Sequence, residues 1–349
     1  MTAGKSPPRA SLIVRSVGRA ELHEALAAAG VQTCASLEIV VVDATGGRHP
    51  PVPASSGAHP IVFVPADAPR TRPVAANAGL DAARGDYLGF LDDDDLVLPQ
   101  HVAGLMAALE AEPACTLAFS IARESRPDAT VRRVGHERLS RLMLLEQCFF
   151  PPCAALFRRS LLAHCRFDES LQAAEDWDFW LQASRYMPFR FVAQETAIYR
   201  AERGRSAMST GAHDEGERWR NAVLHKWASE RAELARETDA AFDQALSMAQ
   251  QGDTDAAMGH ADHVLALYPC HGDALNLRGT LWAMRGNFDA AHRDFHFAVE
   301  ANPDDPASAF NLAQALQRLG RRDEASAALR RVLALDPSHP HARARLAQI

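Results

Sequence analysis

Four consecutive carboxylates, Asp92-Asp93-Asp94-Asp95, follow directly on the apolar segment 87–91. That segment has the pattern of a short buried strand, and open α/β sheets bind ligands at the carboxyl ends of such strands. Adjacent carboxylates repel one another unless a cation lies among them, and their oxygens suit Mg²⁺ or Mn²⁺. The position favours a divalent-metal site over a solvated acidic turn. A structural Ca²⁺ site is disfavoured, because the regular spacing of an EF-hand loop is missing.

A second acidic pair, Glu175-Asp176, opens a segment that carries Trp177 and Trp180. Residues 175–181 have the pattern of a helix whose tryptophans are buried. A carboxylate in such an apolar setting has its pKa raised towards that of a working general base. Simple matching of the two carboxylates to the positive end of the helix dipole explains the pair equally well.

Composition limits the classes of protein to consider. The chain has 349 residues, enough for two domains, and its net charge of −7 argues against nucleic acid as a partner. The six cysteines form no Cys-x-x-Cys pair, which argues against a zinc site and favours a reducing cytosol. Residues 1–9 lack the apolar core of a signal peptide, and no apolar run reaches the roughly 18 residues of a transmembrane helix. We expect a cytoplasmic location, either free or peripheral to a membrane.

Strand and helix patterns alternate through the first part of the chain. Such alternation predicts an α/β fold with a mostly parallel sheet. The segment 123–146 is mixed and basic, and it is assigned only as a connection plus a helix. Short apolar runs predict strands at 11–14, 37–42, 60–64, 87–91 and 117–121, and alanine- and leucine-rich runs predict helices at 20–29, 73–84 and 101–110.

The C-terminal third repeats with a countable period. A fixed helix–turn–helix period of 34 residues is typical of tetratricopeptide (TPR) repeats, to which this part of the chain is similar. Small residues at positions 245, 279 and 313 predict sites where two helices cross closely. The 34-residue step is followed by Gly252, Gly286 and Gly320, by Pro269, Pro303 and Pro337, and by Ala257, Ala291 and Ala325.

These patterns predict the domain organisation. We expect an α/β domain over residues 8–215, a helical linker over 216–237, and three TPR-like repeats over 238–349 that end in a capping helix. An all-α solenoid of this kind presents a concave surface. Such surfaces bind peptide segments of a protein partner or mediate self-association; a structural extension without a ligand is the alternative.

Four blocks of sequence between residue 10 and about 205 carry a family resemblance. In this order they resemble the family 2 inverting glycosyltransferases of the GT-A fold, and the third and fourth blocks together are highly specific. The blocks are Ser11-Leu12-Ile13-Val14 with Arg19 and Leu22; Leu37 to Asp43; Asn77-Ala78-Gly79-Leu80 through Gly85-Asp86-Tyr87 to Asp95; and Leu156 to Leu161 followed by Phe167-Asp168-Glu169 and Glu175-Asp176-Trp177-Asp178.

The resemblance implies a nucleotide-sugar donor, a divalent metal (Mn²⁺ or Mg²⁺) and single displacement with inversion. A metal that bridges the two phosphates would stabilise the charge on the leaving nucleoside diphosphate. The acceptor hydroxyl would belong to a glycan, a lipid-linked sugar or a protein. By resemblance, the metal ligands are Asp94 and Asp92, the base is Asp176 with Glu175 in support or orienting the acceptor, Asp93 accepts a ribose hydroxyl, and Ser16, Asp43 and Asn77 line or adjoin the nucleotide pocket.

Four positions depart from the family's pattern. Ala44 replaces an aspartate that often contacts a uracil ring, Arg15 a proline or threonine, Ala76 an arginine, and Ala201 a histidine. A UDP-type donor is the family expectation, and these departures leave the base open. We expect one of Arg15, Arg70 and Arg72 to supply part of the missing positive charge.

Two functions follow from these observations. The intact acidic motifs favour a metal-dependent glycosyltransferase of the hexosyltransferase type, as in polysaccharide biosynthesis. The losses at Ala44 and Ala76 favour a scaffold protein with a degenerate GT-A domain, whose repeats bind partners.

Overall fold

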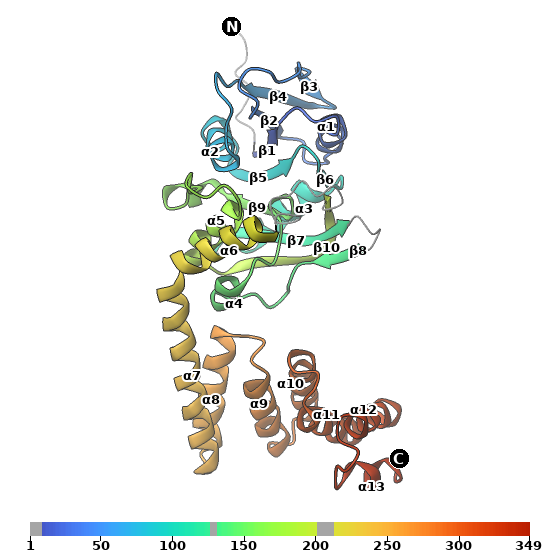
Figure 1. Cartoon of the computed structure of the whole chain (residues 1–349). Coiled ribbons are helices and arrows are strands. Elements are labelled where there is room, and N and C mark those ends of the chain that lie inside the picture. The colour runs from blue at the N-terminus through green and yellow to red at the C-terminus, as the bar shows by residue number, and fades with distance from the viewer. Residues whose placement is uncertain (1–8, 126–130, 201–212) are drawn as a thin grey trace. The chain divides into compact units, whose positions relative to one another are not determined.

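The computed structural model describes residues 9–125, 131–200 and 213–349 (Figure 1). The chain divides into two compact units, Met1–Ala228 and Ser229–Ile349. The boundary falls inside the segment 216–237 that the sequence predicts as a linker. Within the described residues, no helix combines the length and the apolar character needed to cross a bilayer.

The first unit is built around one mixed sheet, in the strand order β3-β4-β2-β1-β5-β9-β7-β10-β6 with β8 beside β7. The half β4-β2-β1-β5 is parallel, and β9 introduces antiparallel pairing on both of its sides. The predicted mixed α/β fold is thus confirmed. The strands are β1 (Ala10–Ser16), β2 (Leu37–Asp43), β3 (Ser55–Ser56), β4 (His59–Val64), β5 (Tyr87–Asp92), β6 (Leu96–Val97), β7 (Leu117–Ser125), β8 (Val131–Val134), β9 (Ala155–Arg158) and β10 (Phe189–Arg200).

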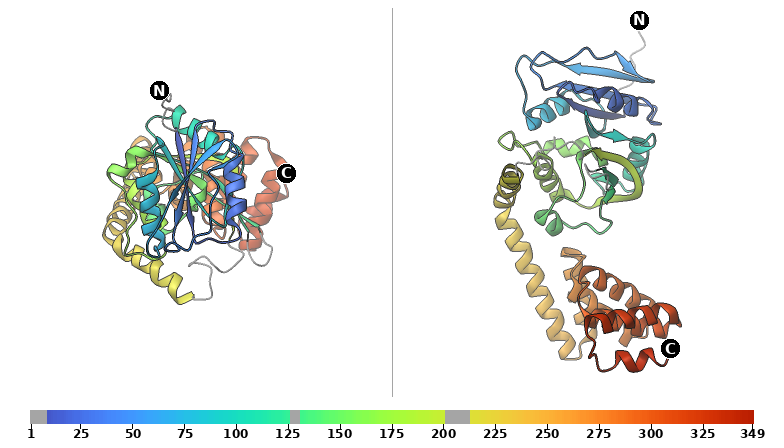
Figure 2. Two further views of the ribbon diagram at one scale, coloured as in Figure 1. Left: turned by 90° about the horizontal axis from the view of Figure 1, so that it is seen from above. Right: turned by 45° about the vertical axis from the view of Figure 1, so that its right-hand side comes forward.

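Helices flank this sheet, and the view from above shows α1 and α2 on opposite faces of its parallel half (Figure 2). The α-helices of the unit are α1 (Leu22–Gly30), α2 (Arg72–Ala82), α3 (His101–Ala111), α4 (Arg141–Glu146), α5 (Glu175–Ala183) and α6 (His213–Lys226). Three short 3₁₀ turns are η1 (Pro152–Ala154), η2 (Arg159–Ala163) and η3 (Ser184–Tyr186).

Strand β1 is the point at which the strand order reverses. It pairs in parallel with β2 on one side and with β5 on the other. The register places Arg15 opposite Asp92 and Ser16 opposite Asp43, all at the carboxyl ends of the three strands. Ligands of open α/β sheets bind in the crevice outside such a switch point.

Helix α2 packs unusually close to this switch point. A Cβ atom on Gly79 would lie 2.3 Å from Cγ2 of Ile13 and 3.1 Å from Cγ2 of Val42. Only a glycine lets the helix sit this near to β1 and β2. The helix begins at Arg72, so its close packing also fixes where that guanidinium lies.

Aromatic side chains of the core pack against α5. Phe167 and Phe179 stack with ring centroids 4.6 Å apart, and Phe150 lies 5.2 Å from Trp180. Phe179 and Trp180 are fully buried. The apolar residues of α5 therefore hold the helix in the core, while its first turn carries Glu175 and Asp176.

The second unit is a stack of helix pairs. Gly252, Gly286 and Gly320 all adopt positive φ, from +74° to +82°, in the turns between paired helices, a conformation that favours glycine. The 34-residue repeat is thus seen in the backbone itself. The helices are α7 (Ala228–Gln250), α8 (Thr254–Leu267), α9 (Gly272–Met284), α10 (Phe288–Ala301), α11 (Pro306–Arg318), α12 (Arg322–Leu335) and α13 (Ala342–Leu346).

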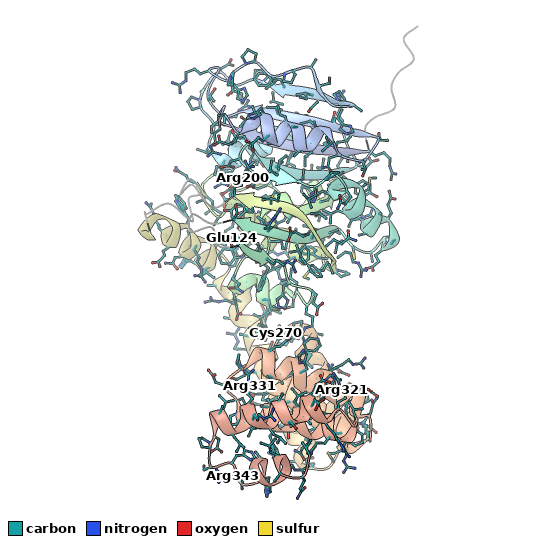
Figure 3. The ribbon with its side chains drawn as sticks, turned by 90° about the vertical axis from the view of Figure 1, so that its right-hand side faces the viewer. Glu124, Arg200, Cys270, Arg321, Arg331 and Arg343 are labelled. Atoms are coloured by element: carbon teal, nitrogen blue, oxygen red, sulfur yellow. The ribbon has the colours of Figure 1, made fainter. Side chains whose placement is uncertain are left out.

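Arginines close the turns at two of the repeated prolines. Arg331 donates to the carbonyl oxygen of Pro303 at 2.8 Å, and Arg343 donates to that of Pro337 at 3.2 Å. Both arginines lie on the C-terminal repeats, together with Arg321 (Figure 3). Arg321 pairs with Glu324 within the start of α12 at 2.6 Å.

The helix crossings differ in size from one repeat to the next. In the second repeat a Cβ atom on Gly279 would lie 2.7 Å from the ring of Phe295. The residues 34 positions later are Ala313 and Leu329, and those 34 positions earlier are Ala245 and Ala261. The largest residue thus faces the smallest one, so the repeats keep one backbone design while exchanging volume across the crossing.

Candidate functional site

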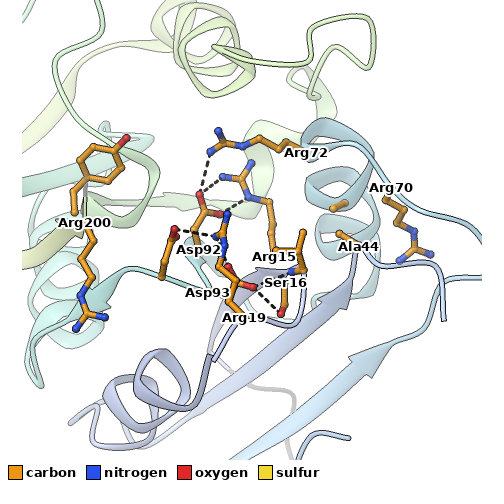
Figure 4. A pocket seen from close by; sticks show the side chains of 13 residues that line it. Arg15, Ser16, Arg19, Ala44, Arg70, Arg72, Asp92, Asp93 and Arg200 are labelled. Carbon is orange, nitrogen blue, oxygen red and sulfur yellow. Dashed lines mark hydrogen bonds and ion pairs between the residues drawn. The ribbon is translucent and has the colours of Figure 1, made fainter. Parts of the chain in front are cut away.

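A cavity of about 110 Å³ lies at the carboxyl ends of β1 and β5 (Figure 4). Its charged lining consists of five arginines and three aspartates, so positive charge is in excess. These residues are Arg15, Arg19, Arg70, Arg72, Arg200, Asp92, Asp93 and Asp94. We call it the arginine cavity.

Arg15 is the central cation of this cavity. Its Nε and Nη2 donate to the two oxygens of Asp92 at 2.7 and 2.8 Å, a bidentate pair. Its Nη1 donates to Oε1 of Glu175 at 2.8 Å. Arg72 also contacts both carboxylates, at 3.1 and 3.2 Å. Burial alone would raise the pKa of Asp92, but Arg15 and Arg72 outweigh burial and hold that pKa below its usual value.

Asp93 and Ser16 form a second polar group in the same cavity. The buried carboxylate of Asp93 accepts hydrogen bonds from Ser16 Oγ at 3.0 Å, from the backbone N–H of Val17 at 2.9 Å and from Arg19 at 2.6 Å. His49 lies 2.7 Å from the Ser16 hydroxyl. Ser16 and Asp93, both predicted to lie at the donor site, are therefore hydrogen-bonded to each other, and both line the arginine cavity.

Asp94 and Asp95 differ sharply from their neighbours. Asp94 pairs with Arg19 at 2.9 Å and is 23% exposed. Burial and the negative charge of Asp92 raise the pKa of Asp94. Asp95 turns into the core, where it accepts from the backbone N–H of Arg200 at 2.9 Å, and burial, followed by Asp92, raises its pKa to about 8. Among the four aspartates 92–95, Asp94 is thus the one whose pKa is raised by burial and by neighbouring carboxylates and whose side chain also lines the arginine cavity.

A second cavity, of about 150 Å³, adjoins the first. It contains Asp176 and Glu124, and much of its wall is apolar. Three residues, Arg72, Asp92 and Tyr199, line both cavities. Asp94 and Asp176 therefore line two adjoining cavities that share these three residues, and the two cavities together are called the cleft below. The apolar wall of this second cavity, the aromatic cavity below, is formed by Val134, Phe149, Phe150, Pro151, Pro152 and Ala174.

The first turn of α5 presents two carboxylates with different surroundings. Glu175 is buried and held by Arg15 and Arg72. Asp176 accepts from the backbone N–H of Trp177 at 2.8 Å and pairs with no cation among the residues described. Burial and the charge of Glu175 raise the pKa of Asp176 to about 6, against the opposing effect of Arg72 and Arg15. This combination suits a general base near neutral pH.

Two of the predicted nucleotide-pocket residues are not among those that line either cavity. Asp43 accepts from the backbone N–H groups of Thr45 and Gly47 at 2.6 and 2.9 Å, and so folds the loop after β2. Asn77 bonds to the backbone of Phe167 and to Glu169, both at 3.0 Å for its amide nitrogen. In this structure both side chains shape the polypeptide around the site.

The sequence analysis leaves out two of the cavity's arginines. From the sequence Arg19 is known only as part of a family block, and Arg200 carries no prediction, because only the fold brings the two close to the aspartates. Arg15, Arg70 and Arg72 do line the cavity, as expected. Ala201, the fourth departure from the family's pattern, lies outside the described residues.

The arginine cavity offers few free carboxylate oxygens to a divalent cation. Both oxygens of Asp92 are bound by guanidinium groups, and within the described ranges no three His, Cys, Asp or Glu side chains are grouped as metal ligands. Asp94 fits a cation, because it is partly exposed and its pKa is raised by neighbouring negative charge. Mg²⁺ is commonly held by one or two carboxylates together with substrate phosphates. Coordination by Asp92 stays a prediction.

Comparison with known proteins bears on this geometry. Residues 12–166 match Glycosyl transferase family 2, over the strands that carry Arg15 and the aspartates. The first unit is thus similar to family 2 glycosyl transferases over these residues. Residues 283–349 match the tetratricopeptide repeat, which confirms the repeat type expected for this part of the chain.

Curated relatives of the glycosyl transferase domain are distant. The uncharacterized glycosyltransferase YwdF of Bacillus subtilis (strain 168) is 26% identical over 183 residues, 51% of this chain and 68% of that protein. The succinoglycan biosynthesis protein ExoO of Rhizobium meliloti (strain 1021) is 29% identical over 184 residues, 48% of this chain and 50% of that protein. The chain thus spans 68% and 50% of the length of these two relatives.

Among solved structures, the first TPR of Spaghetti (RPAP3) bound to an HSP90 peptide is 20% identical. The match covers 32% of this chain and 90% of that chain, with a TM-score of 0.32.

Proposed function

We propose that the protein is an inverting glycosyltransferase that moves a sugar from a nucleotide donor to a hydroxyl acceptor. The observation that carries the proposal is a pair of adjoining cavities, because the arginine cavity and the aromatic cavity share Arg72, Asp92 and Tyr199. One half has the charge for a diphosphate, and the other half holds a carboxylate suited to act as a base. The matched family supports the same assignment.

In this proposal the nucleoside diphosphate binds in the arginine cavity. Arg70 donates to the backbone oxygens of Asp43 and Pro65, and it is the one cavity arginine without a carboxylate partner in the part of the chain described. Its charge is therefore available to phosphate oxygens. Asp94 would hold a divalent cation against the diphosphate; such an ion supplies charge stabilisation for the departing phosphate. Asp93 and Ser16 are placed to meet the ribose.

The acceptor enters the aromatic cavity. Asp176 takes the proton of the acceptor hydroxyl as that oxygen bonds to the anomeric carbon. The bond from the anomeric carbon to the phosphate oxygen breaks on the opposite face, and its electron pair leaves with the diphosphate. Arg15 and Arg72 hold Glu175 in place, and their positive charge moderates the pKa of Asp176.

The lining of the aromatic cavity favours a glycan acceptor. Sugar rings present flat apolar faces that pack against aromatic side chains such as Phe149 and Phe150. The name of ExoO points to polysaccharide biosynthesis for that relative, and we extend the same role to this chain. We also propose a cytoplasmic location and a protein partner, or a second copy of the chain, for the TPR repeats.

The decisive experiment combines nucleotide binding with turnover. Nucleotide sugars with uracil, guanine, thymine and adenine bases are screened for release of nucleoside diphosphate with Mn²⁺ or Mg²⁺ present. We expect one donor to be turned over, and its nucleoside diphosphate to raise the melting temperature by mass action. Asp94→Asn should remove most of the metal-dependent rise. Asp176→Asn should keep it while lowering turnover roughly a hundredfold or more.

Asp67→Asn is the matched control, because it removes one exposed carboxylate of the same unit that lines neither cavity. It should behave like the wild type in both assays. If no nucleoside diphosphate binds with or without metal, the scaffold function expected as the alternative becomes the better account. Full turnover by Asp176→Asn would refute the base assignment.

A further inference from the structure

Asp178 is a fully buried carboxylate on α5, two residues beyond Asp176. Its Oδ1 accepts from Nε1 of Trp227 at 2.8 Å, and its Oδ2 accepts from Nζ of Lys226 at 3.0 Å and from Gln182 at 2.8 Å. A buried carboxylate is tolerated only when it is paired and hydrogen-bonded in this way. Removing its partners therefore acts directly on α5.

Both outside partners come from the end of α6, just before the boundary between the two units. Lys226 also donates to Asp168 at 2.7 Å, so one ammonium joins the segment 167–170 to α5. The indole of Trp227 is buried, with the guanidinium groups of Arg185 and Arg141 at 4.7 and 5.5 Å from its ring centroid. Lys226, Trp227 and Asp178 are called the α6 anchor below.

The start of α5 needs such support. Ala174, directly before Glu175, has φ +58° and ψ +18°, the left-handed conformation. This conformation is unfavourable for an L-residue other than glycine, and such strain persists only where the surrounding contacts over-determine the backbone. Arg15 and Arg72 hold Glu175 beside the arginine cavity. Within the α6 anchor, Lys226 and Trp227 hold Asp178. Asp176 lies between these two fixed points.

We propose that Lys226 and Trp227 are positioning residues for the reaction, which act by holding the first turn of α5 and hence Asp176 at the cleft. This inference rests on the proposed function, in which Asp176 is the base. Neither residue lines the arginine cavity or the aromatic cavity, so neither touches the substrates placed there. Both line a separate cavity with Gln182 and Arg185. A displacement of the base of about 1 Å is enough to cost roughly a hundredfold in rate.

The test uses the full chain and four variants, one of which, Lys226→Arg, keeps the positive charge. Trp227→Phe removes one N–H donor and keeps the ring, and Lys226→Met removes the ammonium and keeps the stem. His225→Gln is the matched control, since His225 is an exposed neighbour on the same helix. Hydrogen exchange of the amides of α5 is measured by mass spectrometry, together with kcat, the donor KM and the melting-temperature rise with nucleoside diphosphate.

We expect Lys226→Met to speed the exchange of α5 roughly tenfold and to lower kcat by about tenfold or more, with the donor KM unchanged. Trp227→Phe should show the same pattern to a smaller extent, and Lys226→Arg should restore both readouts. Wild-type exchange in Lys226→Met and Trp227→Phe overturns the proposal, and so does faster exchange with unaltered kcat. If the wild type turns over no donor, the proposed function fails separately, and the exchange of α5 still decides whether the anchor exists.

Discussion

At the scale of single residues, Asp176 is distinguished from its neighbours by what it lacks. Glu175 and Asp178, on the same helix, are held by Arg15 and by Lys226. Asp176 pairs with no cation in the described part of the chain, and its pKa is raised to about 6 by burial and by Glu175. The protonation of Asp176 can therefore change near neutral pH.

This shift predicts a pH dependence with opposite signs for activity and stability. The base must be ionised, so kcat/KM should rise with pH through about 6 and then level off. The raised pKa means that the folded state favours the protonated form. Its stabilising contribution is complete below the ordinary pKa of about 3.9 and is lost as pH rises through about 6. Turnover and urea unfolding are measured from pH 4 to 8.

Asp176→Asn supplies the comparison for both curves. The variant cannot ionise at this position, so the difference in unfolding free energy between the two proteins should change between pH 4 and 6 and be constant above. A difference that stays flat across this range would show that Asp176 titrates normally and would remove the physical basis for its role as a base.

The sequence identifies the acidic residues of the site better than their partners. Ser16, Asp93 and Asp94 line the arginine cavity and Asp176 lines the aromatic cavity, and the roles assigned to them stay predictions. That Arg15 bridges Asp92 and Glu175, which are 83 positions apart (175 − 92), follows only from strand register and the placement of α5. Local sequence carries no signal for such a long-range pair.

At the scale of elements, the close packing of α2 against β1 and β2 is tested by a matched pair of glycine substitutions. Gly79→Ala places a methyl group 2.3 Å from Ile13, in the closely packed contact between α2 and β1. We expect a loss of about 1–3 kcal/mol in unfolding free energy, and weaker nucleotide binding, because α2 carries Arg72. Gly104→Ala, inside α3 with nothing within 4 Å, should instead gain up to about 1 kcal/mol. Chemical denaturation of both variants measures the difference.

Equal effects of the two substitutions would contradict the close packing of α2. If Gly79→Ala lowers stability but leaves nucleotide binding unaltered, the position of Arg72 does not depend on the close packing of α2.

Strand and helix patterns predict the first half of the sheet well. Strands β1, β2, β4, β5 and β7 and helices α1, α2 and α3 lie within a few residues of the predicted segments. The residues 189–200, which form β10, carry no strand prediction, because their burial is mixed and no apolar run marks the strand. The strand pairs with both β7 and β6. Strand pairing, rather than local pattern, decides this element.

At the scale of the whole molecule, the boundary after Ala228 predicts where the chain can be divided. A chain that ends at Ala228 keeps the α6 anchor and should unfold cooperatively, with turnover retained. A chain that ends at residue 212 leaves Asp178 without Lys226 and Trp227. Loss of the partner of a buried charge costs about 3–5 kcal/mol, so this shorter chain should be unstable. Circular dichroism melts and limited proteolysis measure both.

Equal stability of the two truncated chains would mean that α6 is not part of the first unit. An insoluble chain 1–228 would mean that the repeats complete its core, contrary to the independence of repeat arrays from distant parts of the chain.

The short step from Trp227 to the first residue of α7 sets a rule for how such proteins can be recombined. Helix α7 begins at Ala228, directly after the indole that bonds to Asp178. Gene fusion or exchange of the repeat array preserves the transferase only when the crossover falls downstream of this indole. A different domain fused after Trp227 should leave the first unit active, whereas the same domain fused before α6 should not.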